Sequence, residues 1–557
     1  MERNLCERGK STIRQSGYPA EGGLVRSKAG VVVVWLVPAL TLILASCSGD
    51  RREAPTTVLI DSDPAFAERT LELAEELLAP YGLEVAFALP GEQPHITVNR
   101  QSEPGAEPFV TGYWVAAAAL SSEKTDLTVA ELHAGRLIVP VGQLPPFEAW
   151  WGGGTPDFLP VMSNEIARAL DSDSSSIALM RLDDVRPGVR SLPVNGVDVV
   201  FGAGTLDDYP LVEQAWVSAA AHENADFALI LDEAKDGLAK RLALDYMPPK
   251  PTILRATGDI IPARCVYAKQ RDYGDFAHAF RELGPWLSQA DITVGSLDAS
   301  ISDAGRPFGC TPTFSLLAPA RSVEGLVYAG FDVMTVATNH VKDCGQDSCG
   351  DQAFFDTLDI LRSNGIEPVG GGANLAEARA PAIIDVRGTT FAFLGYDEIA
   401  PYYHAGEGTA GVAPLTQAFL MEDIAALREQ VDVIVVLPQW GVEYTNDPTE
   451  TQRSRASVAV KAGADLVIGN HPHWVQAAEA FGASFVAYAL GNFVFDQDWS
   501  IPTQQGVVLE AAFHGADLKG VRFHPIRIVD AHQPTFASVA EAQEILDRIW
   551  AASAALP

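Results

Sequence analysis

The chain has 557 residues, which is too many for a single ordinary core, so two or three domains are expected. Hydrophobic residues make up 47% of the chain and charged residues 20%, a composition typical of a folded protein and not of a disordered one. The formal net charge is -33, so nucleic acid and anionic lipid surfaces are poor partners for most of the surface.

The first feature along the chain is an apolar run from Ala29 to Ala45, preceded by Arg26 and Lys28 and followed by Ser46-Cys47. A basic start, a short apolar stretch and small residues are typical of a secretory signal. The ending Leu-Ala-Ser-Cys resembles a bacterial lipoprotein signal, which implies cleavage before Cys47 and a lipid anchor on its thiol. An uncleaved single-pass helix is the alternative, and the run is somewhat short for that. Both interpretations place the protein after the signal region, residues 1–47, outside the cytoplasm.

Residues 56–246 are expected to form a first α/β domain, because strand-like and helical stretches alternate there. The segment Asp61-Ser62-Asp63-Pro64 is expected to cap a helix that runs through Leu78. Thr128 and Glu131 have the spacing of a capping box. The strand-like runs are Thr57–Ile60, Leu137–Val141 and Val197–Phe201.

An apolar strand is followed by the segment from Asp126 to Leu137, and this succession resembles the type II periplasmic-binding-protein fold. The resemblance covers about half of residues 56–246. Such a domain would hold a small ligand between two lobes. A phosphate site would need a turn rich in Ser, Thr or Gly at a helix N-terminus, but Asp61 and Asp63 would repel phosphate. The ligand is therefore not a simple anion, or the domain has lost binding. A structural or docking domain without a ligand is the alternative.

A proline-rich hinge at residues 247–251 marks the expected domain boundary. From residue 252 to 530 the alternation of strands and helices is stronger, and residues 531–557 are expected to hold a final helix from Val539 to Ala555. The expected strands are Ile253–Ala256, Ile292–Leu297, Val333–Ala337, Phe391–Gly395, Val433–Leu437, Leu466–Ile468, Phe485–Tyr488 and Val507–Ala512. The expected helices are Phe276–Leu287, Val323–Ala329, Ala353–Asn364, Gln417–Gln430 and Gln452–Ala462.

Residues that can bind metal follow three of these strands. Asp259 follows the first, Asn339-His340 follows the third, and His471 and His473 follow Leu466–Ile468. Open α/β folds bind ligands at the carboxyl ends of their strands. Carboxylate and amide oxygens together with imidazole nitrogens suit Mn, Fe or Zn. The sequence therefore predicts a site for one or two divalent transition metals, with His340 pointing into the same pocket.

Five motifs occur in a characteristic order: Thr257-Gly258-Asp259, Gly330-Phe331-Asp332-Val333 with Ala337-Thr338-Asn339-His340, Trp440-Gly441-Val442-Glu443-Tyr444, Gly469-Asn470-His471-Pro472-His473, and Tyr488-Ala489-Leu490-Gly491-Asn492-Phe493-Val494-Phe495-Asp496. On these motifs, nearly all of residues 252–500 resembles the CapA family, named for a poly-γ-glutamate capsule protein, within the calcineurin-like metallophosphoesterase superfamily. The resemblance implies an α/β/β/α sandwich. It also implies that Asn339 binds metal, that His340 contacts the scissile group, and that two metals hold a phosphate and activate a water.

The chain departs from the family pattern at three places. Asp298 stands where the family usually has Glu, and its shorter side chain can still be a ligand. Gln439 stands where the family often has His, and a neutral amide is a weaker metal ligand than imidazole. Ile261 stands where superfamily phosphatases have a further His. The second metal is therefore expected to be loose, different or absent.

Other residues near these motifs are candidates for metal or pocket contacts. They are Gln439, Glu443, Asn492 and Asp496, with a role in the fold expected for Glu443 and Asp496, and a bracing role for Asn492. Asp343 is expected to shape a turn, and Trp440 and Trp474 either wall a substrate or pack in the core.

Four cysteines of the second half fit two disulfides in an exported protein. Cys344 and Cys349 would close a small loop, which leaves Cys265 with Cys310. Zinc binding by the four thiols is the alternative, although the chain has no Cys-x-x-Cys pair.

The expected function is that of an exported, lipid-anchored CapA-like protein with metal-dependent hydrolase chemistry, linked to capsule or poly-γ-glutamate synthesis. The bond cleaved would be a phosphoester or a γ-glutamyl amide. A non-catalytic ligand-binding or scaffold lipoprotein with a degenerate metal site is the alternative. The expected partners are the membrane through the lipid anchor and a cell-envelope polymer or small ligand, with no nucleic acid.

Overall fold

The computed structural model describes residues 55–151, 157–173 and 175–557. The predicted signal and its Cys47 lie outside these residues. None of the helices in the described ranges combines the length and the apolar character needed to cross a membrane. Residues Ala54–Pro557 form one compact unit.

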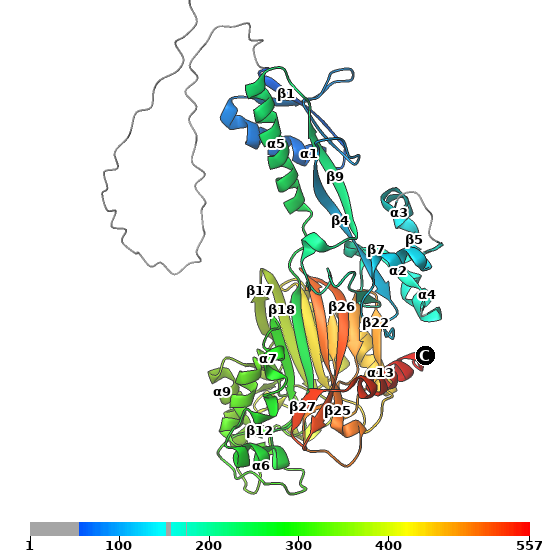
Figure 1. Cartoon of the computed structure of the whole chain (residues 1–557). Coiled ribbons are helices and arrows are strands. Elements are labelled where there is room, and N and C mark those ends of the chain that lie inside the picture. Colours follow the sequence, from blue (N-terminus) through cyan, green and yellow to red (C-terminus); the bar gives the residue numbers. More distant parts are fainter. Residues whose placement is uncertain (1–54, 152–156, 174) are drawn as a thin grey trace, which may run out of the picture. The chain divides into compact units, whose positions relative to one another are not determined.

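The first part of this unit is built on a nine-stranded mixed sheet, with strand order β2-β1-β3-β9-β4-β7-β5-β6 and β8 paired to β4 (Figure 1). Its strands are β1 (Thr57–Ser62), β2 (Glu84–Phe87), β3 (Ile96–Asn99), β4 (Glu107–Ala118), β5 (Leu137–Pro140), β6 (Phe158–Val161), β7 (Ile177–Arg181), β8 (Arg190–Leu192) and β9 (Val212–Ala219). Its helices are α1 (Ala67–Leu78), α2 (Val129–Ala134), α3 (Leu144–Trp151), α4 (Ile166–Ser172) and α5 (Ala225–Asp245). The long antiparallel strands β4 and β9 connect two groups of strands, each with its own buried apolar cluster.

Three local expectations for this part have different outcomes. The capping box of Thr128 and Glu131 at the start of α2 is confirmed. The predicted cap on α1 is wrong, because the N-cap residue is Phe66 and no side chain caps the helix, while the Asp63 carboxylate accepts a hydrogen bond from Ala65 N. The predicted strand Val197–Phe201 is also wrong. The Asp198 carboxylate accepts hydrogen bonds from the backbone N–H groups of Val200 and Phe201, so this apolar run is a turn.

The second part contains an eight-stranded and a six-stranded sheet. The first has the order β15-β14-β11-β10-β25-β26-β27, with β24 beside β10, and the second has the order β17-β18-β20-β21-β23-β22. The strands of the first are β10 (Thr252–Ile260), β11 (Ile292–Leu297), β14 (Val333–Thr335), β15 (Glu367–Val369), β24 (Asn492–Val494), β25 (Gln505–His514), β26 (Asp517–Val529) and β27 (Gln533–Phe536). Those of the second are β17 (Ala382–Val386), β18 (Thr389–Asp397), β20 (Val433–Gln439), β21 (Leu466–Ile468), β22 (Ala478–Phe481) and β23 (Ser484–Ala487).

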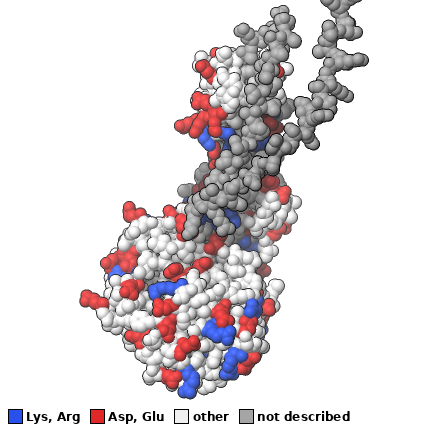
Figure 2. Space-filling view, turned by 90° about the vertical axis from the view of Figure 1, so that its left-hand side faces the viewer, with Lys and Arg blue, Asp and Glu red and all other residues white. Residues whose placement is uncertain are grey.

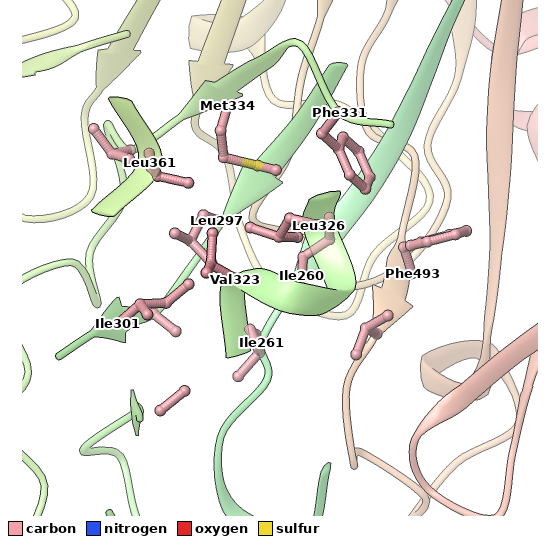
Figure 3. Packing of buried hydrophobic residues seen from close by; sticks show 14 of the residues in the cluster. Ile260, Ile261, Leu297, Ile301, Val323, Leu326, Phe331, Met334, Leu361 and Phe493 are labelled. Atoms are coloured by element: carbon pink, nitrogen blue, oxygen red, sulfur yellow. The ribbon is translucent and has the colours of Figure 1, made fainter. Parts of the chain in front are cut away.

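Three apolar clusters show how these sheets and the helices are layered. One cluster joins the facing surfaces of the two sheets, with residues such as Leu254 and Val435. A second fills the space between the eight-stranded sheet and α6 (Arg264–Tyr273), α7 (Gly284–Leu287), α8 (Val323–Ala329) and α9 (Gln352–Ser363), where Ile260, Leu326 and Met334 pack together (Figure 3). A third lies between the six-stranded sheet and α10 (Leu375–Ala378), α11 (Gln417–Arg428) and α12 (Glu450–Ala462). The order is helix, sheet, sheet, helix, so the expected α/β/β/α sandwich is confirmed.

The strands expected after residue 252 are all present, because each is a largely apolar and buried run. The expected helix over 276–287 is wrong, since Pro285 restricts its continuation and only a 3-10 turn and the four-residue α7 form there. Residues 531–557 begin with strand β27 on the edge of the sheet and continue into α13 (Val539–Ala554). Helices α5 and α6 and strand β26 were not anticipated.

The four cysteines of the second part pair as expected, Cys265 with Cys310 and Cys344 with Cys349.

Acidic and basic side chains are interspersed over the face shown in Figure 2, with red Asp and Glu side chains spread along it. Lys and Arg number 39 against 72 Asp and Glu, so the surface is acidic as a whole.

Candidate metal site at the meeting edges of the two sheets

The carboxyl ends of parallel strands from both sheets meet at one place. Asp259 lies at the end of β10 and Gln439 at the end of β20. The Gln439 amide donates to Asn339 Oδ1 at 3.2 Å, which links the two sheets. The backbone N–H of His471 donates to Asp259 Oδ2, also at 3.2 Å. Residues separated by up to 212 positions are thus brought to one edge, as expected from their places after strands.

Asp259 owes its place to a close approach between two backbone segments. Strand β10 pairs with β24, and Asp259 N donates to Gly491 O at 3.0 Å. A Cβ atom on Gly258 would lie only 1.9 Å from Gly491 O, so no other residue fits there without moving the strand. The Thr-Gly-Asp motif therefore has a steric reason: glycine lets β24 come close, and the next residue carries the buried carboxylate.

The His-x-His turn after β21 has an unusual backbone. His471 has φ 100° and His473 has φ 59°, a left-handed region that non-glycine residues rarely adopt. Each such residue costs about 1 to 3 kcal/mol, and such strain persists where the surrounding structure holds it, often at functional sites. Both histidines are 5% exposed, so this turn places two imidazoles inside the protein at a cost in backbone energy.

His473 is held by hydrogen bonds on one side of its ring. Its Nδ1 lies 2.9 Å from Asn492 Oδ1 and 3.4 Å from Asp259 Oδ2. Asn492 in turn donates from Nδ2 to Thr503 O at 2.8 Å, which orients its amide oxygen toward the histidine. Nδ1 therefore donates, and Nε2 is left as the free nitrogen. Burial lowers the pKa of His473, but the hydrogen bond with Asp259 and the charges of Asp259, Asp298 and Glu443 together outweigh burial, and the net shift is upward.

Several buried polar atoms of the site have no hydrogen-bond partner among the described residues. Both carboxylate oxygens of Asp298 are in this state, as are His471 Nδ1, Asn470 Oδ1 and Gln439 Oε1. Asp298 is fully buried, and burial together with the nearby Asp259 raises its pKa to about 6 against the opposing effect of His340. Buried polar atoms are normally paired, and an unpaired carboxylate among imidazoles and amide oxygens has the chemistry of a cation ligand.

No group of three or more His, Cys, Asp and Glu side chains could hold a metal ion as these side chains are placed in the described part of the chain. The donor types nevertheless fit a divalent transition metal. The unpaired Asp298 carboxylate and the unpaired His471 nitrogen are two such donors, and Asp259, Asn339 and His473 contribute three more within the same network.

His340 forms a pair with Asp343. Its Nδ1 lies 2.8 Å from Asp343 Oδ2, and the same oxygen accepts from Leu316 N at 2.7 Å. Burial lowers the pKa of His340, but the charges of Asp298 and Asp343 and the hydrogen bond raise it to about 9. His340 is therefore protonated at neutral pH, with Nδ1 fixed and Nε2 available as a proton donor. Asp343, for which only a turn was expected, also orients this histidine.

The remaining candidates are at the edge of the site or outside it. Asp496 binds the Arg264 guanidinium and accepts from Cys265 N at 3.0 Å, which gives it a role in the fold. The Glu443 side chain is 42% exposed, and its Oε1 lies 4.0 Å from His473 Nε2, so Glu443 lies at the entrance to the candidate metal site. Asn492 acts through His473, as described above.

Asp397 was missed by the sequence analysis. It ends β18, in register with Gln439 on β20, and it is fully buried. Its Oδ2 accepts from Ala400 N at 2.8 Å and lies 3.3 Å from His404 Nε2, while Oδ1 has no partner in the part of the chain that the structure describes. The signal was available, because Asp397 follows the expected strand Phe391–Gly395 at the same sheet edge.

Aromatic side chains border the site. The Tyr444 ring is stacked over His473 with 6.0 Å between ring centroids, and Trp499 meets Tyr444 edge to face at 4.8 Å. Trp499 is 60% exposed. Trp440 is buried and donates from Nε1 to Tyr488 O at 2.8 Å, so it packs in the core and does not wall a substrate. Trp474 also contacts Tyr444, at 6.5 Å between centroids.

An α/β/β/α sandwich with acidic, amide and imidazole side chains at the meeting carboxyl edges of its two sheets is what the resemblance to the CapA family implies. Residues 253–497 match the family model described as "Bacterial capsule synthesis protein PGA_cap". The resemblance of residues 252–500 to the CapA family is therefore confirmed.

Two curated relatives are similar over the same part. "PGA biosynthesis protein CapA" of Bacillus subtilis (strain 168) is 29% identical over 284 residues, which are 51% of this chain and 72% of the relative. "Capsule biosynthesis protein CapA" of Bacillus anthracis is 29% identical over 250 residues, which are 44% of this chain and 59% of the relative.

Among solved structures, the NAD nucleotidase NadN of Haemophilus influenzae has a TM-score of 0.31 at 13% identity and covers 54% of this chain and 62% of its own. An ABC-type phosphate transport receptor from Vibrio cholerae has a TM-score of 0.24 at 12% identity and covers 34% of this chain and 98% of its own. Likenesses with TM-scores this low carry no conclusion about function.

Proposed function

We propose that this chain is an exported protein, anchored to the membrane through a lipid on Cys47, that acts as a metal-dependent hydrolase in the synthesis of a capsule or of poly-γ-glutamate. The names of the relatives support the link to capsule and poly-γ-glutamate. The N-terminal signal pattern and the two disulfides support a place outside the cytoplasm. The hydrolase chemistry rests on one observation, the fully buried Asp298 carboxylate, which has no hydrogen-bond partner among the described residues.

The side chains that would hold one or two Mn, Fe or Zn ions are Asp259, Asp298, Asn339, His471 and His473. When bound, such a metal supplies Lewis acidity and activates water for attack on a phosphoester or a γ-glutamyl amide. Gln439 is not among the ligands, because its amide already donates to Asn339 and so orients a ligand. Three residues then act through others: Asn492 holds His473, Asp343 holds His340, and Gln439 holds Asn339.

His340 supplies the proton for the leaving group. Asp343 raises the pKa of His340 and fixes its Nδ1, so that Nε2 carries the transferable proton. A protonated His340 also favours binding of an anionic substrate group beside Asp298. Tyr444 and the exposed Trp499 border the entrance, where they can contact the part of the substrate that is not cleaved.

Metal content tests this proposal. The purified protein is reconstituted with Mn, Fe or Zn, desalted, and measured by inductively coupled plasma mass spectrometry beside a His473→Ala variant. A matched control is His133→Ala, which changes an exposed histidine on α2. One or two equivalents of metal in the wild type and in His133→Ala, with loss in His473→Ala, support the proposal. Metal absent from all three proteins after reconstitution would overturn it.

A non-catalytic scaffold is the second candidate, because the chain has Gln439 and Ile261 where imidazoles are usual in the family and superfamily. A scaffold needs no stoichiometric transition metal, so the same measurement separates the two. If metal is retained, hydrolysis of phosphoester and γ-glutamyl substrates is the next assay. The acidic surface makes tight binding of a polyanion unfavourable except where metal or a local basic group intervenes.

A further inference from the structure

A cavity of about 430 Å³ lies away from the candidate metal site. It is bordered by residues 120–125 and Arg190 on one side and by β26 and α13 on the other, all within the one compact unit. Cavities of this size hold small organic ligands. Every lining residue belongs to the described part of the chain.

Part of the cavity wall is apolar. Leu120, Phe523, Leu546 and Trp550 line it, and all four are partly buried against the core between the two sheets. The Phe523 and Trp550 rings meet edge to face with 5.7 Å between centroids. Such a wall binds an apolar or aromatic group and excludes water from the polar groups beside it.

Another part of the cavity wall carries positive charge. Arg190 and Arg522 both line the cavity, in a chain with nearly twice as many acidic as basic residues. Arg522 is paired with Asp198 and lies over the Phe201 ring at 3.8 Å. Arg190 donates from Nη1 to the backbone carbonyl of Ser122 and forms no ion pair with any carboxylate in the described ranges.

Arg190 is therefore a half-buried cation beside a second cation, with one neutral partner. Burial and the charge of Arg522 both lower its pKa, which reflects the energetic cost of this arrangement. Glu123, the acidic residue of the lining, is exposed and lies beyond ion-pair distance. An anion placed in the cavity would meet the unpaired donors of a guanidinium, whose planar fork suits carboxylate and phosphate oxygens.

We propose that this cavity is a second binding site, which takes a small amphiphilic anion: a carboxylate or phosphate held by Arg190, with an apolar or aromatic body against Phe523, Leu546 and Trp550. The site is separate from the proposed hydrolase site and does not depend on metal. It gives the protein a way to bind an anionic small molecule although its surface as a whole is acidic.

Binding of three small probes to the full-length protein, measured by isothermal titration calorimetry, tests the site. The probes are phenylacetate, phenyl phosphate and the uncharged phenylacetamide, which share a ring and differ in charge. We expect at least one of the two anions to bind at least tenfold more tightly than phenylacetamide. The tighter of the two anions then identifies a carboxylate or a phosphate as the natural head group.

The Arg190→Gln variant should abolish this preference for the anion, and Trp550→Leu should weaken binding of all probes at least threefold. Arg186→Gln, which changes an exposed arginine four residues away, is the matched control and should bind as the wild type does. Equal affinity for charged and uncharged probes, no binding of any probe, or unchanged binding in Arg190→Gln would overturn the proposal. If Arg190→Gln does not fold, the folded Trp550→Leu variant decides: binding at least threefold weaker supports the site, and unchanged binding overturns it. Metal content should be unchanged in both variants, which separates this test from that of the hydrolase site.

Discussion

Replacing Asp298 by Asn tests directly whether the site is built for a cation. In the metal-free protein this carboxylate is fully buried and has no hydrogen-bond partner within the described ranges. The nearby charges of His340 and His473 offset only part of the charge of Asp298. A buried charge without hydrogen-bond partners costs about 3 to 5 kcal/mol, whereas an unpaired neutral amide costs about 1 to 3 kcal/mol. The substitution should therefore stabilise the metal-free protein by about 2 kcal/mol, the difference between the two costs.

With metal bound the sign should reverse, because the carboxylate is then a ligand and the amide is a weaker one. Thermal unfolding is measured for both proteins in EDTA and in excess MnCl2. We expect the Asp298→Asn substitution to raise Tm by about 4 to 8 °C in EDTA, at about 2 to 4 °C for each kcal/mol. In MnCl2 the wild type should be the more stable of the two.

Asp465→Asn is a control for the substitution itself. Asp465 Oδ2 accepts from Arg428 Nη1 and from Ile434 N, each at 2.8 Å, so its charge is compensated. The variant should be destabilised to the same degree with and without Mn. A loss of stability in Asp298→Asn that is equal in EDTA and in MnCl2 would refute the reasoning, since Asp298 would then be an ordinary structural residue.

Three further predictions concern the fold around the site. Gly258→Ala should lower the free energy of unfolding by about 3 kcal/mol and reduce metal content, because the new Cβ would lie 1.9 Å from a carbonyl oxygen. Gly309 has open space around it, so Gly309→Ala should change neither the free energy of unfolding nor the metal content. Replacing Cys265 and Cys310 with Ser removes their disulfide and should lower the free energy of unfolding by about 4 kcal/mol, the loop-entropy value for about 45 residues. Chemical denaturation measures this loss, and an unchanged denaturant midpoint would contradict the prediction. Burial raises the pKa of Glu510, but His524 and Arg255 outweigh burial and lower it to about 2. Because the folded pKa is below the unfolded value of 4.5, Glu510 stabilises the fold above pH 4.5 by about 3 kcal/mol and loses this as pH falls toward 2. Glu510→Gln should flatten the pH dependence of Tm in that window, and an unchanged slope would argue against it.

Much of the site was predictable because its residues follow strands. Asp259, Asn339 and His471 each come after a short apolar, β-branched run, and parallel strands bring their carboxyl ends to one edge. The same rule would have identified Asp397, which follows the expected strand Phe391–Gly395 and was overlooked for lack of a histidine or asparagine beside it.

The errors have local causes. Val197–Phe201 has the composition of a strand, but the side chain of Asp198 takes up backbone N–H groups that a strand would need. The stretch 276–287 has helical periodicity, and Pro285 limits the helix to short turns. In both places one residue overrides the pattern of its neighbours.

The sequence by itself determined the strands expected after residue 252, their order and the identity of the candidate ligands, because hydrophobic periodicity and strand-end position are local properties of the chain. Tertiary structure alone decided which of these side chains touch. Asn492 holds His473 and Asp343 holds His340 through contacts that depend on the paths of loops. Asp298 has no hydrogen-bond partner among the described residues, and Arg190 lies near Arg522, because segments far apart in the chain pack together. The burial of these side chains and the charges around them are therefore set only when the whole unit packs.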